Sequence, residues 1–172
     1  MRIVYTNTEC CEMESQFEYF EKTTTNIIDK LIKEQGPDIC RNIIDTNYIN
    51  LETKDYDFGF IHKTPIAQLG QKRYTRTTPQ FVYSFILCKL YPEISEIDIT
   101  LICSRPNTKD GKILIELVCE RAKTLGYQRL SLLSIGEKKV LNWYKSQDFF
   151  LVNQKPFPNG EIKAYSMRKM IM

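Results

Sequence analysis

Four predicted secondary-structure elements, the first two joined by a polar loop, follow one another closely within residues 95–149, and their order constrains the fold more than any other feature. Residues 94–103 alternate like a strand, and residues 111–125 carry an apolar stripe with a period of about 3.6, which indicates a helix. A second strand at 130–134 and a short helix at 137–146 complete the series. Strands that alternate with helices in this way predict the α/β class.

The flanking segments extend this series on both sides. Apolar residues recur at near-helical spacing from Phe17 to Ile32, which predicts a helix that ends at Gly36 and Pro37. We also predict a weak strand at 57–63, a central strand at 81–90, and a closing hairpin formed by residues 149–154 and 161–168. No repeat or linker interrupts the pattern, so we predict a single domain over residues 1–172.

The composition argues against several functional classes. With 42% hydrophobic and 26% charged residues the chain can bury a full core, and its formal net charge of +3 is too small to indicate a nucleic-acid or membrane partner. No apolar run approaches the roughly 20 residues of a membrane span. Residues 1–9 lack the apolar region of a secretory signal. We therefore expect a cytoplasmic protein in a reducing environment.

The histidine and the cysteines limit the chemistry further. The chain has one histidine, His62, and six cysteines without the C-x-x-C spacing of a zinc site, so we expect no metal centre. Cys88 and Cys103 lie in apolar strand patterns, where we expect free thiols. Cys103 lacks a histidine partner for nucleophilic catalysis. His62 is interpreted as a polar residue at the end of a strand.

A polar loop at residues 104–112 leads directly into the helix at 111–125. The free backbone N–H groups at a helix N-terminus attract anions. Arg105, Lys109 and Lys112 add positive charge to the loop. Asp110 adds a negative charge, and both Asp110 and Asn107 tolerate the left-handed backbone that such a loop needs. The loop therefore predicts a site for a phosphorylated cofactor.

Two blocks of residues resemble the GNAT superfamily of acetyl-CoA-dependent N-acetyltransferases. In that family a loop of the form Q/R-x-x-G-x-G/A precedes the helix. Here Gly111 occupies the last position, Lys109 the central glycine and Pro106 the first position. The second block is similar to the family signature N-F-Y-x-x-x-G-F and consists of Asn142, Trp143, Tyr144, Asp148 and Phe149, with Asp148 in place of the usual glycine. The resemblance implies the GNAT fold, an α/β fold with a mixed central sheet of about six or seven strands flanked by helices.

The resemblance also implies an activity and a set of site residues. The protein would move an acetyl group from acetyl-CoA to a primary amine by direct attack in a ternary complex. Tyr144 would be the general acid toward the CoA sulfur, and Glu96, or alternatively Asp98, the general base. Backbone groups of the strand would pair with the pantetheine arm and polarise the thioester carbonyl. The implied cofactor-binding residues are Leu101, Ile102, Cys103, Arg105, Lys109, Asp110, Gly111, Lys112, Ser134 and Asn142.

Other interpretations of these residues remain open. Packing on the buried face of its helix explains Tyr144 equally, and Glu96 and Asp98 are also typical of solvated positions at the start of a strand. The glycine-poor loop suits a GNAT-fold protein that lacks catalysis and serves as an acyl-CoA sensor or interaction module. An unrelated α/β nucleotide binder is a third reading, although the loop lacks G-K-[ST] and G-x-G-x-x-G. The sequence identifies neither the acceptor amine nor the choice between monomer and homodimer.

Overall fold

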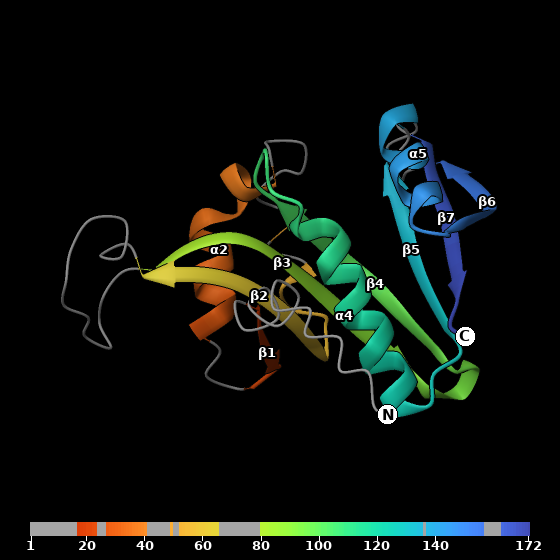
Figure 1. Cartoon of the computed structure of the whole chain (residues 1–172), viewed down its shortest axis with the longest axis horizontal. Coiled ribbons are helices and arrows are strands. Elements are labelled where there is room, and N and C mark those ends of the chain that lie inside the picture. The colour runs from red at the N-terminus through yellow and green to blue at the C-terminus, as the bar shows by residue number, and fades with distance from the viewer. Residues whose placement is uncertain are drawn as a thin grey trace, which may run out of the picture.

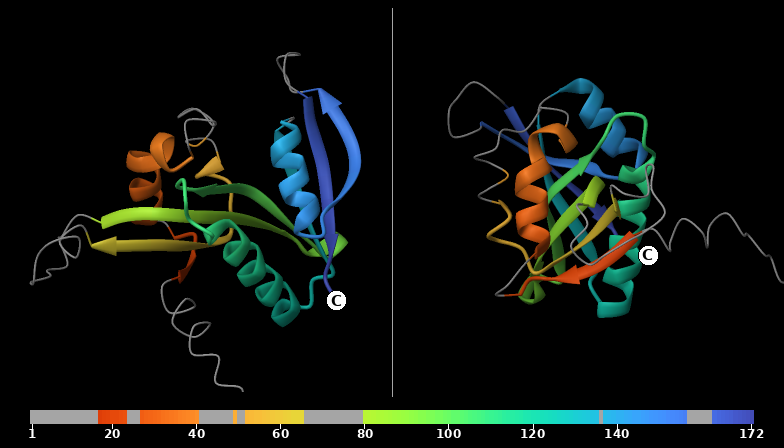
Figure 2. Two further views of the ribbon diagram at one scale, coloured as in Figure 1. Left: turned by 45° about the horizontal axis from the view of Figure 1, so that its top comes forward. Right: turned by 90° about the vertical axis from the view of Figure 1, so that its left-hand side faces the viewer.

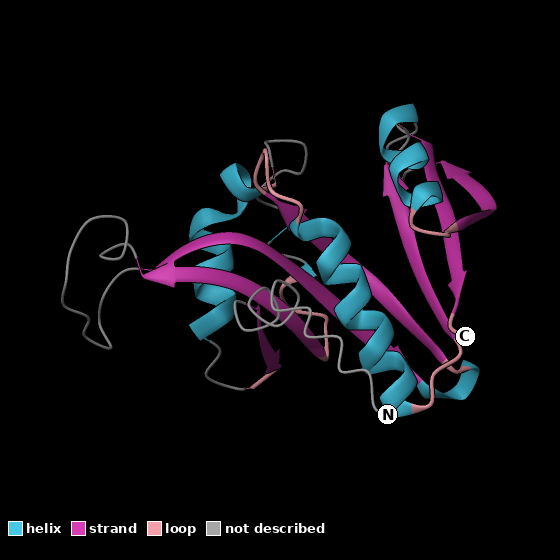
Figure 3. Cartoon of the chain, in the orientation of Figure 1, coloured by secondary structure: helices cyan, strands magenta, loops and turns pink. Residues whose placement is uncertain are grey.

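The computed structural model describes residues 17–23, 27–40, 49, 52–65, 80–135, 137–156 and 163–172. Seven strands form one sheet in the order β1-β2-β3-β4-β5-β7-β6, flanked by helices (Figures 1 and 3). The strands are β1 (Phe17–Glu21), β2 (Phe58–Pro65), β3 (Gln80–Tyr91), β4 (Glu96–Ser104), β5 (Arg129–Ile135), β6 (Phe150–Pro156) and β7 (Lys163–Met170). The helices are α2 (Ile27–Ile39), α4 (Asp110–Leu125), α5 (Lys138–Ser146) and the short 3-10 helix η2 (Pro92–Ile94).

The first four strands form an antiparallel half-sheet that is covered on both faces. Helix α2 lies on one face and α4 crosses the other (Figure 1). On the α2 face Ile32 and Phe85 are fully buried, and on the α4 face Ile86 and Leu114 are fully buried. The apolar stripe that predicted α4 is thus confirmed as the face that packs on the sheet.

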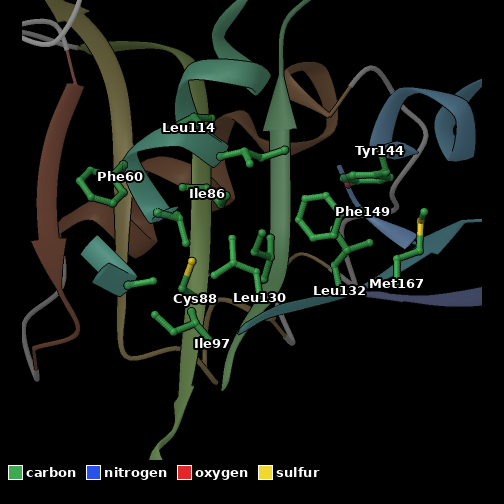
Figure 4. Packing of buried hydrophobic residues seen from close by; sticks show 14 of the residues in the cluster. Phe60, Ile86, Cys88, Ile97, Leu114, Leu130, Leu132, Tyr144, Phe149 and Met167 are labelled. Carbon is green, nitrogen blue, oxygen red and sulfur yellow. The ribbon is translucent and has the colours of Figure 1, made fainter. Parts of the chain in front are cut away.

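The second half of the sheet contains β5, β7 and β6, with α5 packed against one face (Figure 2). Its strands pair antiparallel with one another, and only β4 and β5, at the junction of the halves, run parallel. One core cluster spans both halves, from Phe60 and Ile86 to Phe149 and Met167 (Figure 4). Apolar contacts therefore join the halves on the face that carries α4 and α5.

The structure corrects the predicted first helix. Residues Phe17–Glu21 form the edge strand β1, which pairs antiparallel with β2. Gly59 of β2 makes room for this strand, because a Cβ there would lie 2.5 Å from the ring of Phe20. Helix α2 also continues past Gly36, whose missing side chain lets Ile49 approach: a Cβ there would lie 2.8 Å from Ile49 Cδ1. Pairing between distant segments overrode the helical spacing.

Candidate functional site at the junction of β4 and β5

The strands β4 and β5 separate after four pairs of residues. Their register runs from Glu96 opposite Arg129 to Ile99 opposite Leu132. Beyond this point the described part of β4 pairs with β3 alone, and β5 pairs with β7 alone. The separation is visible as the divergence of the two half-sheets in Figures 1 and 2. Among the described residues, the β5-facing edge of residues 100–103 therefore offers backbone groups that no strand pairing uses.

A bulge in β4 coincides with this separation. Leu101 pairs with Leu87 and Ile99 pairs with Cys88, so Thr100 is an extra residue on β4. A bulge bends its strand and increases the local twist, which turns the end of β4 away from β5. Leu101 and Cys103, which follow the bulge, are buried on the α2 face. Ile102 packs against the α4 face, so the three predicted pantetheine-binding residues follow the separation point directly.

The first turn of α4 begins six residues after the end of β4, at Asp110. Its N-cap residue, Lys109, makes no side-chain capping hydrogen bond. The first N–H groups of a helix have no partner within the helix, so this turn offers donors to an anion. Lys109 and Lys112 are both exposed beside it. Gly111 is buried, and a Cβ there would lie 3.1 Å from Cζ2 of Trp143, so α5 approaches this turn closely.

Two of the charged loop residues lie differently from the prediction. Asp110 does not face the loop surface: its carboxylate accepts a hydrogen bond from Ser84 and contacts the ring of His62. Burial alone would raise the pKa of Asp110, but the hydrogen bonds from His62 and Ser84 outweigh it and lower the pKa. Arg105 turns toward β3, where its Nε donates to the Val82 carbonyl at 2.7 Å and its guanidinium lies over Phe81. Neither side chain adds charge at the loop surface.

The left-handed backbone positions are partly as predicted. Asn107 has φ 64°, which confirms the prediction that this residue takes a left-handed backbone conformation in the loop. Asp110 instead has the backbone of a first helical residue. Asp148, which replaces the glycine of the closing signature, also has φ 64°. An aspartate tolerates this conformation better than most residues, so the signature keeps its turn without glycine.

Tyr144 lies on the buried side of α5. Its exposed fraction is 7%, and its ring makes edge contacts with Trp143 and Phe149 at centroid distances of 4.9 and 5.8 Å. Figure 4 shows the ring beside Phe149 at the edge of the shared core. The other two predicted cofactor contacts differ in exposure: Asn142 is exposed on α5, and Ser134 on β5 is buried.

The two candidate bases lie in the paired part of β4, before the strands separate. Glu96 is buried, with Oε2 lying 3.5 Å from Nε of Arg129 and 3.1 Å from Nε of Arg168. Arg129 belongs to β5 and Arg168 to β7, so the carboxylate of Glu96 is engaged in ion pairs that cross the junction. Asp98 accepts a 2.6 Å hydrogen bond from Ser131, and burial raises its pKa. The geometry therefore favours Asp98 over Glu96, the reverse of the order expected from sequence.

The cysteines correct a further prediction. Cys103 is not a free thiol: it forms a disulfide with Cys40, which directly follows α2. Sequence spacing could not predict this bond because 63 residues separate the partners. Cys88 is free and buried, as predicted. The disulfide joins the end of β4 to the helix on the opposite face from α4, and the expectation of a fully reduced chain fails at this pair.

Two further kinds of feature are absent from the described part of the chain. There, no group of three or more His, Cys, Asp or Glu side chains could hold a metal ion. None of the helices in the same ranges is long and apolar enough to cross a membrane.

Sequence reasoning missed the contact of His62 and Ser84 with Asp110, because the three residues lie on three different elements. His62 was interpreted as an ordinary strand residue, but Nδ1 of its ring lies 2.8 Å from Oδ2 of Asp110. The contact of Trp143 with Gly111 was missed as well. No local pattern signals either contact, since each joins residues that are distant in the chain.

Comparison with known proteins identifies the fold. No family model and no curated protein sequence matches the chain. An acetyltransferase from Desulfovibrio desulfuricans assigned to the GNAT family superposes with a TM-score of 0.65 at 10% identity, over 91% of this chain and 99% of that one. The ribosomal-protein-alanine N-acetyltransferase of Escherichia coli gives 0.59 at 14% identity, over 90% and 94%.

A third solved structure is an aminoglycoside 6′-N-acetyltransferase in complex with coenzyme A. It superposes with a TM-score of 0.61 at 10% identity, over 90% of this chain and 97% of that one. Identities this low establish the fold and leave the activity open. The separated β4 and β5, the helix that begins beside them and these three superpositions lead to one conclusion: this chain has the fold of the GNAT acetyltransferases.

Proposed function

We propose that the protein is an N-acetyltransferase that moves an acetyl group from acetyl-CoA to a primary amine. The observation that carries this proposal is the edge of β4 at residues 100–103, which pairs with no described strand on the β5 side and leads to the start of α4. The edge of β4 offers backbone partners for an amide-containing chain, and the first turn of α4 offers hydrogen-bond donors for a diphosphate. Coenzyme A contains both groups in one molecule, and one structural neighbour is known with coenzyme A bound.

The residues of β4 and α4 divide the binding of the cofactor between them. The pantetheine arm would lie along Leu101, Ile102 and Cys103, whose backbone groups also polarise the thioester carbonyl. The diphosphate would lie at the first turn of α4, whose backbone N–H groups have no partner within the helix. Lys109 and Lys112 are exposed there and add favourable charge. The Nε of Arg105 donates a hydrogen bond to a carbonyl of β3, so the Arg105 side chain is left out of this assignment.

The reaction also needs a neutral amine and a protonated leaving thiolate. An ordinary amine with a pKa of about 10.4 is mostly charged at neutral pH, and forming its neutral form costs roughly 4–5 kcal/mol. Asp98 is the favoured base, acting directly or through water, because its raised pKa brings it closer to the working range. Tyr144 is the proposed acid, since a phenol is protonated at neutral pH and this one stands in the closing signature.

Calorimetric titration with acetyl-CoA, followed by a thiol-release assay over a panel of amines, tests the proposal. We expect binding at a single site and release of free CoA with at least one class of amine. The panel contains peptide N-termini, lysine peptides, polyamines, amino acids and aminoglycosides, and mass spectrometry identifies the acetylated product. Absence of acetyl-CoA binding would contradict the proposal.

One observation favours a second candidate, a GNAT-fold acyl-CoA sensor without catalysis. Glu96, the base preferred from the sequence, is buried between two arginines in the paired part of β4, before the strands separate. The same titration separates the candidates, because a sensor binds acetyl-CoA but releases no thiol with any amine. Retention of Tyr144 in its signature is the reason to place the enzyme first.

A further inference from the structure

Three polar side chains from β2, β3 and α4 meet at the first turn of α4. The carboxylate oxygen Oδ2 of Asp110 accepts a 2.7 Å hydrogen bond from Ser84 Oγ and lies 2.8 Å from Nδ1 of His62. Ser84 is fully buried, and the side chains of His62 and Asp110 are 16% and 11% exposed. We call these three residues the α4 brace. The proposed chemistry does not use them.

Strand β3 also holds the other end of the loop that precedes α4. The backbone N–H of Arg105 donates to the carbonyl of Tyr83 at 2.9 Å, and its Nε donates to the carbonyl of Val82 at 2.7 Å. Since Ser84 binds Asp110, three consecutive residues of β3 fix both ends of the loop. Residues 106–109 span these two anchors, so the anchors restrict the shape that the short segment adopts.

This loop needs such anchors because its sequence provides few others. Its N-cap, Lys109, makes no side-chain capping bond, and its only glycine is Gly111. The His62 ring is itself held in place by stacking on Tyr83 at a centroid distance of 4.6 Å and by Phe17 at 5.0 Å. Because the His62 ring is held by two aromatic rings, its contact with Asp110 gives the first turn of α4 one orientation relative to the sheet.

The brace also controls where the charge of Asp110 lies. A carboxylate at the loop surface would repel a diphosphate, whereas this one is turned inward and bonded to two side chains. The hydrogen bonds keep its pKa below the ordinary value despite burial, so the carboxylate is ionised at neutral pH and both contacts persist. Its charge remains close to the favourable N-terminal end of the helix dipole.

We propose that Asp110 is a positioning residue: His62 and Ser84 hold its carboxylate, and through it they fix the first turn of α4 for the diphosphate of coenzyme A. The brace gives the backbone amides a fixed arrangement in a loop that lacks the additional glycines of the family pattern. The inference rests on the proposed function, because it requires that this turn binds the cofactor. It predicts that the brace contributes to the diphosphate part of affinity and not to the pantetheine part.

The test compares coenzyme A with pantetheine, which lacks the diphosphate. Both are titrated into the full chain as wild type and as the variants Ser84→Ala, His62→Phe and His62→Asn. Ser84→Ala and His62→Phe each remove a donor to Asp110, and we expect each to weaken coenzyme A binding about tenfold with pantetheine binding unchanged. Asn at position 62 can place its amide nitrogen near the site of Nδ1, so His62→Asn should restore most of the affinity.

Tyr56→Phe provides the matched control. Tyr56 also donates a hydrogen bond to an aspartate, with Oη 2.6 Å from Asp29 Oδ1, but it lies on the α2 face. The Tyr56→Phe variant should be less stable than the wild type but should bind coenzyme A with unchanged affinity. If the folded brace variants bind coenzyme A like the wild type, or lose both ligands equally, the inference is overturned. Failure of the wild type to bind coenzyme A would instead overturn the proposed function itself.

Discussion

A carboxylate group lies near each end of β4, and the two have opposite consequences for the junction. Glu96, at the first end, contacts Arg129 of β5 and Arg168 of β7, so its ion pairs tie the two half-sheets together. Asp110, beyond the last end, is held by His62 and Ser84, which both belong to the first half-sheet. The ion pairs of Glu96 join the two half-sheets, whereas the contacts of Asp110 hold the first turn of α4 on one side of the junction. The proposed ligand site lies where the polar contacts between the two half-sheets end.

The largest expected effect tests the open end, where the disulfide joins β4 to α2. A bond that closes a loop of this length stabilises a fold by about 3–4 kcal/mol, because it restricts the unfolded chain. Cys40→Ser should therefore lower the free energy of unfolding, measured in urea, by about that amount. Reductant should destabilise the wild type and leave the variant unchanged. Cys119→Ser, which alters a free cysteine, is the control.

The second prediction breaks the closed end. Glu96→Gln leaves the two arginines without their charged partner, and we expect a loss of about 2–3 kcal/mol, reduced from the fully buried case because both arginines are about one-third exposed. Coenzyme A affinity should be unchanged. Glu34→Gln, in the exposed pair with Lys30, should change stability by less than about 0.5 kcal/mol. Equal losses of stability in the two variants would contradict the role of Glu96 in joining the half-sheets.

The third prediction concerns Tyr144 on α5, which lies on the other side of the junction. Tyr144→Phe removes the proposed proton donor and should lower turnover about tenfold, equivalent to about 1.4 kcal/mol, with acetyl-CoA affinity nearly unchanged. Tyr127→Phe is the control, because Tyr127 follows α4 near the closed end of the junction. Steady-state kinetics with the best amine from the panel gives the measurement. Unchanged turnover would exclude Tyr144 from the mechanism.

The smallest expected effect concerns the raised pKa of Asp98. Burial raises the folded-state pKa of Asp98, so its stabilising contribution is complete below the unfolded pKa and is lost as pH rises through the folded pKa. Asp98→Asn keeps a partner for Ser131 and cannot ionise. Its stability relative to the wild type should therefore increase between acidic and neutral pH, by less than about 1 kcal/mol. A constant difference across this range, measured by urea unfolding, would contradict the assigned pKa shift.

The sequence predicted best those elements whose pattern is local. The period of α4 and the alternation of β4 follow from which face each element buries, and the closing signature located α5 and Tyr144. The strand β1 was missed because its apolar residues fit helical spacing. Only its pairing with β2, some forty residues further along the chain, makes it a strand.

The site was predicted in outline but not in its side-chain partners. The loop before α4 was located correctly, yet His62 and Ser84 lie 48 and 26 residues away from Asp110 in the chain, and the partner of Cys103 lies 63 residues away. Charge pattern alone suggested that Arg105 and Asp110 would face an anion. The packing of β3 turned both inward, because residues of β3 provided acceptors and donors within reach of the loop.

The contact between Trp143 and Gly111 has a practical consequence. Trp143 is the chain's single tryptophan, and its indole lies against the helical turn proposed to receive the cofactor. Indole emission responds to local polarity and to quenching groups, so the unlabelled protein contains its own optical reporter. Stopped-flow fluorescence could follow cofactor arrival directly, with no second tryptophan to obscure the signal.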